Sequence, residues 1–130
     1  MRKAILMMLL AIVSNSVAAE WVLAGRNKTA TIYTDPATIS KAGDRVKMWV
    51  LHDFHQTAMD AYGKKPYKSS KVQAEYDCKN EQTRILYTSD LSGNMGEGDV
   101  INGDSVPSNW IPVARGSIGE DLWEFACGKM

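Results

Sequence analysis

RVKMWVLHDF, residues 45–54, is the strongest strand signal in this chain of 130 residues. The apolar residues of one face recur with the two-residue period of a strand: Val46, Met48, Val50 and Phe54. Trp49 and Leu51 add apolar surface to the opposite face, which otherwise carries charged residues. The segment therefore predicts a strand that is buried on one face and covered at the middle of the other.

Further strand signals lie on both sides of this segment. Apolar, β-branched or alternating residues predict strands at 21–25, 30–34, 71–78 and 83–90, with an edge strand at 98–101. Asp35 and Pro36 end the second of these, because proline cannot donate to a ladder. The alternation breaks over residues 55–66, which predicts a polar loop with a helical turn at 57–61. Together these segments predict an antiparallel sheet of about 5–6 strands.

The C-terminal segment has the period of a helix instead. Ser117 precedes Glu120 by three residues, which is the spacing of a capping box. Apolar residues then recur at positions 118, 122, 125 and 126, and Gly128 is suited to end the helix. Strands come first and the helix last. The predicted fold class is therefore α+β, a single antiparallel β-sheet with a C-terminal helix packed on one face.

The first 19 residues have the layout of a secretory signal peptide. Arg2 and Lys3 precede an apolar run at 4–13, and small residues follow up to Ala19. The run is too short to span a bilayer as a helix. Cleavage after Ala19, or one residue earlier, leaves residues 20–130 as a single α+β domain. No cysteine lies near this point, so we expect a soluble periplasmic or secreted protein without a lipid anchor or a membrane span.

Export determines what the two cysteines, Cys78 and Cys127, indicate. In an oxidising compartment two cysteines of a small domain usually form a disulfide. Two buried thiols, a catalytic thiol or a metal pair are the alternatives, although neither cysteine belongs to a C-x-x-C motif and no histidine lies within ten residues of either. A disulfide would tie the end of the helix to the strand at 71–78.

Lysines gather in one place although the whole chain is neutral. Its 15 Lys and Arg residues balance 15 Asp and Glu residues, which argues against nucleic acid as a partner. No acidic residue lies between Asp60 and Glu75, and this interval holds Tyr67 and four lysines: Lys64, Lys65, Lys68 and Lys71. The pattern predicts a docking patch for an acidic partner. The alternative is a solvated loop with ordinary lysines.

His52, Asp53 and His55 are the candidates for metal binding or general-base chemistry. On a strand, however, the two histidines point to opposite faces, because their separation is odd. A metal site would also need a third donor, which the sequence does not place. A structural role for these residues is the alternative, and we expect no cofactor.

Other motifs have simpler explanations. Residues 96–104 lack the ligand order of a calcium loop, and residues 116–119 lack the G-x-S-x-G pattern of a nucleophile elbow. A stacking platform for sugars is conceivable among the tryptophans, but a small domain needs most of them for its core: Trp21, Trp49, Trp110 and Trp123.

In the order and spacing of its features, the chain resembles the surface-adhesin protein E family of small exported bacterial proteins. The matching features are an early tryptophan, a Y-x-D element, a lysine-rich segment before the first cysteine, and a helix that ends in the second: Trp21, Tyr33–Asp35, residues 63–71 and Cys127. The resemblance implies an antiparallel sheet flanked by helical segments, a disulfide between the matching cysteines, and often a homodimer. Family members adhere to host extracellular-matrix proteins through the basic stretch, which here contains lysine alone.

We therefore expect an exported, non-enzymatic, adhesin-like protein. The resemblance and the local charge imply that it presents a Lys/Tyr loop to a host matrix protein or to an acidic glycan or polymer: Lys64, Lys65, Tyr67, Lys68 and Lys71. One alternative is a small periplasmic metal-binding protein or hydrolytic enzyme that uses His52, Asp53 and His55. Another is a structural or inhibitory envelope module that acts through the sheet edge.

Overall fold

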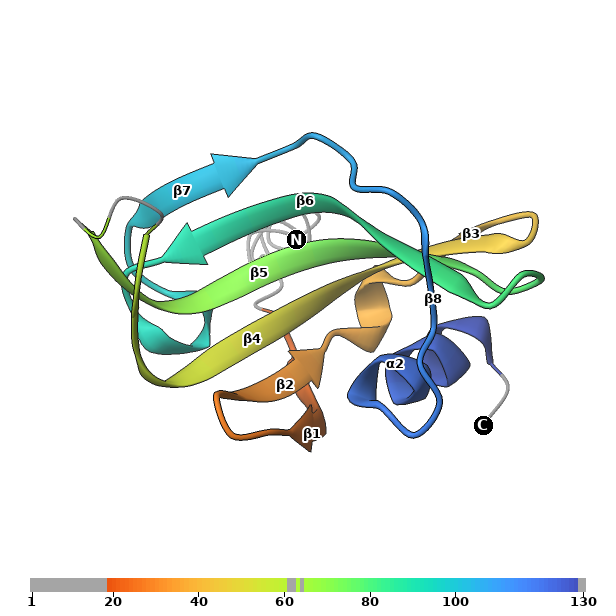
Figure 1. Ribbon diagram of the computed structural model, residues 1–130, viewed down its shortest axis with the longest axis horizontal. Helices are drawn as coiled ribbons and strands as arrows, with labels where there is room; N and C mark the ends of the chain where they lie inside the picture. The colour runs from red at the N-terminus through yellow and green to blue at the C-terminus, as the bar shows by residue number, and fades with distance from the viewer. Residues whose placement is uncertain (1–18, 61–62, 64, 129–130) are drawn as a thin grey trace, which may run out of the picture.

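The computed structural model describes residues 19–60, 63 and 65–128, which form a strongly twisted antiparallel sheet with a helix against one face (Figure 1). The predicted signal peptide lies outside these residues except for Ala19. The main strands lie in the order β1-β2-β4-β5-β6-β7, with bounds Val22–Arg26, Ala30–Thr34, Arg45–Met59, Pro66–Asp77, Gln82–Leu91 and Val100–Asp104. Two short strands complete the described sheet: β3 (Ser40–Ala42) pairs with β4, and β8 (Ile111–Pro112) pairs with β6. The predicted α+β class is confirmed, with somewhat more strands than expected.

The β4–β5 hairpin is the centre of the sheet, and it is longer than the sequence pattern indicates. The predicted loop at 55–66 is wrong for half of its length, because β4 continues to Met59 and β5 begins at Pro66. The helical turn expected at 57–61 is wrong for residues 57–59, which are strand. Ala58 pairs with Tyr67 and Met59 with Pro66. Hydrogen bonds between paired strands satisfy the backbone N–H and C=O groups whatever the polarity of the side chains. Strand pairing therefore overrides the local sequence signal here.

The helix α2 (Ile118–Cys127) is capped as predicted. Ser117 Oγ accepts a hydrogen bond from the Glu120 N–H at 3.0 Å, and Gly128 ends the helix with a φ of +71°. Leu122, Trp123 and Ala126 are its buried residues. The stripe therefore includes Trp123, which the period did not select.

One face of the sheet packs against this helix and contains the hydrophobic core. The core cluster brings together residues of four elements, β2, β4, β5 and α2: Ala30, Ile32, Val46, Met48, Val50, Ala74, Tyr76, Leu122, Trp123 and Ala126. Cys78 and Cys127 lie beside the cluster and form the predicted disulfide. The bond ties the C-terminus of α2 to the residue that follows β5.

The opposite face is covered at its middle. Leu51 is 0% exposed there, because the short 3-10 turn η2 (Asn94–Gly96) lies over it. Register places Trp49 next to Gln73 and Tyr87, and Leu51 next to Lys71 and Ser89, across the three central strands. The prediction of a partly covered second face is confirmed, and an uncovered aromatic strip remains beside η2.

Candidate functional site

The lysine-rich stretch lies on and beside β5 rather than in a loop. Lys65 and Lys68 are exposed, Lys71 is half-buried, and Lys64 falls outside the described residues. Lys68 and Lys71 are three positions apart on one strand, so their side chains point to opposite faces of the sheet. Lys65, directly before β5, and Lys68 both lie near the end of the β4–β5 hairpin, whereas Lys71 points to the other face of the sheet from Lys68.

Tyr67 lies at the same end of the hairpin as Lys65 and Lys68. Its ring meets Phe54 edge-on, with the centroids 5.7 Å apart. Burial, together with the carboxylates of Asp90 and Asp60, raises the pKa of the Tyr67 phenol. The tyrosine is therefore held in position by the sheet.

The structure does not bring His52, Asp53 and His55 together into one site. The Asp53 carboxylate accepts hydrogen bonds from the Met95 N–H at 2.8 Å and the Asn94 side-chain amide at 3.0 Å, and so fastens η2 to β4. His55 Nε2 shares a hydrogen bond of 2.9 Å with Thr31 Oγ1. His52 is half-buried, and burial lowers its pKa.

The part of the chain that the structure describes holds no set of side chains suited to bind a metal ion. Its residues contain no group of three or more His, Cys, Asp or Glu side chains that could hold an ion. Within residues 19–60, 63 and 65–128, no helix combines the length and apolar character needed to cross a bilayer.

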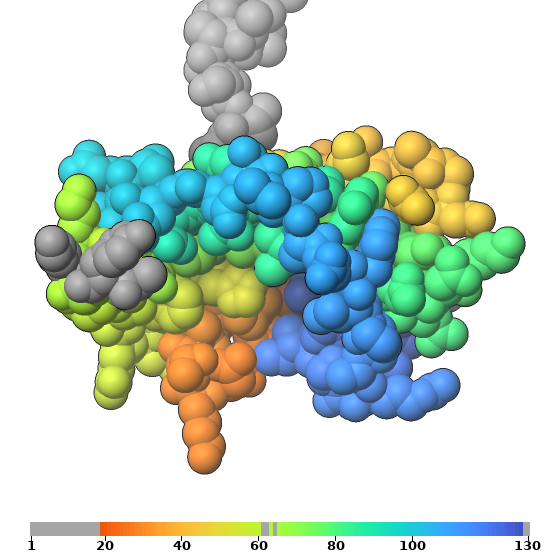
Figure 2. Space-filling view, turned by 45° about the horizontal axis from the view of Figure 1, so that its top comes forward, coloured from red at the N-terminus to blue at the C-terminus, as the bar shows by residue number. Residues whose placement is uncertain are grey.

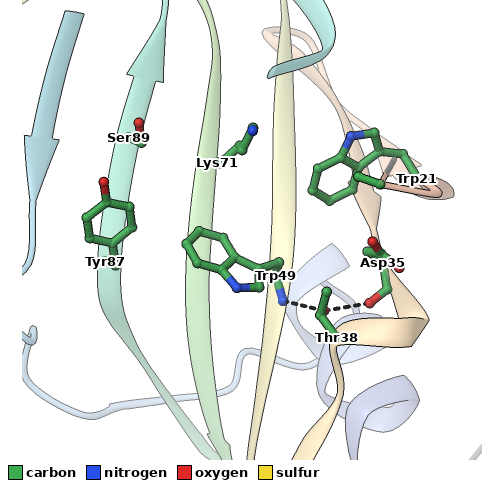
Figure 3. A pocket seen from close by; sticks show the side chains of 8 residues that line it. Trp21, Asp35, Thr38, Trp49, Lys71, Tyr87 and Ser89 are labelled. Carbon is green, nitrogen blue, oxygen red and sulfur yellow. Dashed lines mark hydrogen bonds between the residues drawn. The ribbon is translucent and has the colours of Figure 1, made fainter. Parts of the chain in front are cut away.

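The open face of the sheet carries a cavity of about 360 Å³, which we call the aromatic groove (Figure 3). Trp21, Trp49 and Tyr87 are its large side chains, and its remaining lining residues are Asp35, Thr38, Lys71 and Ser89, with Ala19, which the predicted cleavage would remove. The rings of Trp49 and Tyr87 meet at 74° with their centroids 5.7 Å apart. Figure 3 shows Trp21 on one side, Tyr87 and Ser89 on the other, and Trp49 between them.

Lys71 lies in the middle of this groove and leans on η2. A Cβ added at Gly96 would come within 2.7 Å of Lys71 Cε and 3.4 Å of Leu51 Cδ1, and Gly96 has a φ of +74°. Glycine is therefore needed at position 96 for both its backbone angle and the passage of the lysine side chain. A second hollow of about 450 Å³ adjoins the groove, sharing Trp21 and Lys71 and adding Met95, Gly96 and Glu97.

The rim near Asp35 is held by hydrogen bonds. Asp35 Oδ1 accepts from the Ala37 N–H at 3.0 Å, and Oδ2 accepts from the Glu20 N–H at 3.4 Å. Thr38 Oγ1 donates to the Asp35 carbonyl at 2.6 Å and accepts from the Trp49 N–H at 3.0 Å. These bonds join the segment before β1, the turn η1 (Pro36–Thr38) and β4 at the wall of the groove.

Sequence reasoning identified parts of this groove but did not assemble it. The apolar second face of the 45–54 segment pointed to Trp49, and Trp21 was a candidate for sugar stacking. Tyr87, Ser89 and Gly96 gave no separate signal, because only the strand register brings β6 and η2 beside Trp49. Lys71 was selected, but for the lysine patch on the other side of the sheet.

Solved structures confirm the fold. Two crystal structures of Haemophilus influenzae protein E, one of them crystal form II, superpose with TM-scores of 0.69 and 0.67 at 12% identity. Each match covers 87% of this chain, and 91% and 87% of the respective protein E chain. Protein E from non-typeable Haemophilus influenzae matches over 88% of this chain and 79% of its own, with a TM-score of 0.67 and 12% identity.

Sequence comparison identifies the family. Among curated proteins, none is significantly similar to this chain. The family model of surface-adhesin protein E, by contrast, matches residues 21–128, which include all eight strands, the helix and both cysteines. The chain therefore belongs to the surface-adhesin protein E family.

Proposed function

We propose that this protein is an exported, non-enzymatic adhesin-like protein that binds an acidic partner with the end of its β4–β5 hairpin. The binding surface consists of Lys65, Tyr67 and Lys68, together with Lys64 from outside the described residues. A host matrix protein or an acidic surface polymer would supply the opposite charge. Family membership supports adhesion as the role, and the predicted signal peptide supports export.

The exposure of Lys65 and Lys68 near the end of the β4–β5 hairpin is the observation that carries the proposal. Both side chains are exposed, and neither has an ionic partner among the described residues. Tyr67 lies between them and is fixed against Phe54. A surface held in place before binding loses little conformational freedom on association, and unpaired lysines attract an acidic partner over a range set by salt.

The test compares two charge-reversal variants of the mature, oxidised protein. K65E/K68E alters the proposed surface, whereas K41E/K79E makes the same change in net charge at the opposite end of the sheet, at β3 and the β5–β6 turn (Figure 1). Binding to immobilised heparin and to an extracellular-matrix extract is measured at two salt concentrations. We expect K65E/K68E alone to lose the salt-sensitive binding.

Two outcomes would contradict the proposal. If the unchanged protein binds neither surface at either salt concentration, the acidic partner is wrong. If both variants lose binding equally, net charge accounts for retention and the hairpin end has no special part in it.

A further inference from the structure

We propose that the aromatic groove is a second binding site, for an acidic saccharide whose pyranose ring packs on Trp21, Trp49 and Tyr87 while its carboxylate pairs with Lys71. The groove lies on the open face of the sheet, away from Lys68. The inference is independent of the hairpin surface, since the two sites share none of the lysines used in the two experiments.

The walls of the groove suit a flat ring with apolar C–H groups. Three large aromatic side chains enclose a volume of about 360 Å³. Trp49 and Tyr87 stand edge to face, so a ligand meets two surfaces at a steep angle, with Trp21 on the far side (Figure 3). Small-molecule sites are typically such apolar hollows with a few polar groups that fix orientation. Leaving these three aromatic residues only half-buried on one face of a small domain also sacrifices burial that the core could use.

The charge of the groove selects an anion. Lys71 has no ion-pair partner among the described residues, and its stem lies against Gly96 of η2. Asp35 also lines the groove, but it is only 6% exposed and accepts hydrogen bonds from two backbone N–H groups. Glu97 is exposed at the edge of the adjoining hollow, where solvent screens it. Lys71 is therefore the charged group available to a ligand.

Ser89 provides a second polar contact. This residue is 6% exposed, lines the groove, and its hydroxyl has no hydrogen-bond partner within the described part of the chain. No buried side-chain oxygen or nitrogen of the described residues lacks a hydrogen-bond partner, so the Ser89 hydroxyl is open to solvent and accessible to a ligand. A sugar hydroxyl or carboxylate oxygen bound beside Lys71 would complete its hydrogen bonding.

A saccharide accounts for these features better than a lone anion does. A simple carboxylate would use Lys71 and Ser89 but leave the aromatic walls without a role. The adjoining hollow of about 450 Å³ continues past Lys71 and provides room for a neighbouring sugar unit. The occupant to which the observations point is thus a sugar acid at the end of, or within, a glycan chain.

The test uses glucuronate, glucose and acetate as probes with the mature, oxidised protein. Glucose lacks the carboxylate, and acetate lacks the ring. Two of the four tryptophans line the groove, so tryptophan emission reports occupancy directly. We expect glucuronate to give a saturable change in emission, and both other probes to bind at least tenfold more weakly, since each lacks one of the two contacts.

Variants separate this site from the hairpin surface. K71M retains the apolar stem but removes the charge, and we expect it to weaken glucuronate binding about tenfold or more. W49L removes one aromatic wall and should have a similar effect. K68M changes a lysine of the same strand on the opposite face and should bind glucuronate as the unchanged protein does. Thermal unfolding shows that each variant is folded.

The proposal is overturned if glucuronate gives no saturable signal, if acetate binds as tightly as glucuronate, or if K71M binds glucuronate unchanged. Saturation-transfer NMR adds a second readout, in which the ring protons of glucuronate should receive magnetisation from the protein. A failure here would leave the hairpin proposal intact, because that depends on K65E/K68E and on a different surface.

Discussion

Cys78 and Cys127 are joined by a disulfide with their Cα atoms 5.7 Å apart, although 49 positions separate them in the sequence. Cys78 directly follows β5, and Cys127 is the last residue of α2. Beside the bond, Trp123 Nε1 donates to the Asp77 carbonyl at 3.0 Å. The helix is therefore attached to the central hairpin by one covalent bond and one buried hydrogen bond at the same place.

Removing the disulfide should destabilise the fold strongly. A closed loop of this length restricts the unfolded chain by about 4 kcal/mol, a large part of the roughly 5–15 kcal/mol that stabilises a typical domain. We expect C78S/C127S to lower the free energy of unfolding by about that amount in urea denaturation. The reduced, unchanged protein serves as the control and should behave like the double variant. Equal stability of the oxidised and reduced forms would contradict this account.

Trp110 should hold the segment between β7 and α2 against the sheet. Its ring contacts two guanidinium groups, with the ring centroid 5.1 Å from Arg45 Cζ and 4.6 Å from Arg84 Cζ. Figure 2 shows this segment as a band across the surface that runs from β7 to the helix. Each cation–π contact contributes about 0.5–1 kcal/mol at a partly exposed site.

We therefore expect W110A to lower the free energy of unfolding by about 1–2 kcal/mol. Amide exchange at Val113, whose N–H donates to the Glu81 carbonyl at 3.0 Å, should become faster. W110F keeps an aromatic ring, so its free energy of unfolding should fall less than that of W110A. Unchanged exchange at Val113 in W110A would show that the stack does not hold the segment.

The titration of Asp77 should make the free energy of unfolding depend on pH in acidic solution. The Asn80 N–H and side-chain amide, and then the Lys79 N–H, donate to its carboxylate and hold its pKa below the usual 3.8. The folded state thus favours the charged form. Its stabilising effect is complete above about pH 3.8 and is lost as the pH falls through the lowered pKa. Urea denaturation between pH 2 and 7 should show D77N less stable at neutral pH, with the difference shrinking in acid. A constant difference would be contrary to this prediction.

His52 should add a second pH effect at milder acidity. Burial lowers its pKa from 6.5, so the folded state binds this proton less readily than the unfolded chain does. Stability should therefore fall as the pH drops below about 6.5 and level off once the pH is under the lowered value. H52Q cannot titrate, so its unfolding free energy should change less between pH 7 and 5. A variant that keeps the full pH dependence would rule out His52 as its source.

Signal-peptide cleavage should strengthen the contact between Glu20 and Asp35. If cleavage follows Ala19, as predicted, the backbone nitrogen 3.4 Å from Asp35 Oδ2 becomes a charged α-amino group. Hydrogen bonds between charged groups are stronger than neutral ones. We expect the mature chain to have a higher thermal midpoint than the same chain with an N-terminal acetyl group. D35N should remove this difference, and a difference that persists in D35N would contradict the pairing.

Local patterns of the sequence predicted the elements whose environment is itself local. The Ser117 cap, the Gly128 stop and the two-residue period of 45–54 each depend on neighbours within a few positions, so they were correct. The segment 55–66 was predicted wrongly, because its strand character comes from pairing with β5. The same cause explains the missed strand β3, whose residues 40–42 bond to β4.

The amino-acid sequence by itself determined the fold class, the cysteine pair and the capped helix, because periodicity, residue chemistry and caps act over short distances along the chain. Only the tertiary structure decided which lysines lie on which face of the sheet. Alternation along β5 places Lys68 and Lys71 on opposite faces, and strand register brings Lys71 beside Trp49, Tyr87 and Ser89. Such neighbours are far apart in the chain, and hydrogen-bonded register, rather than spacing in the sequence, sets their positions.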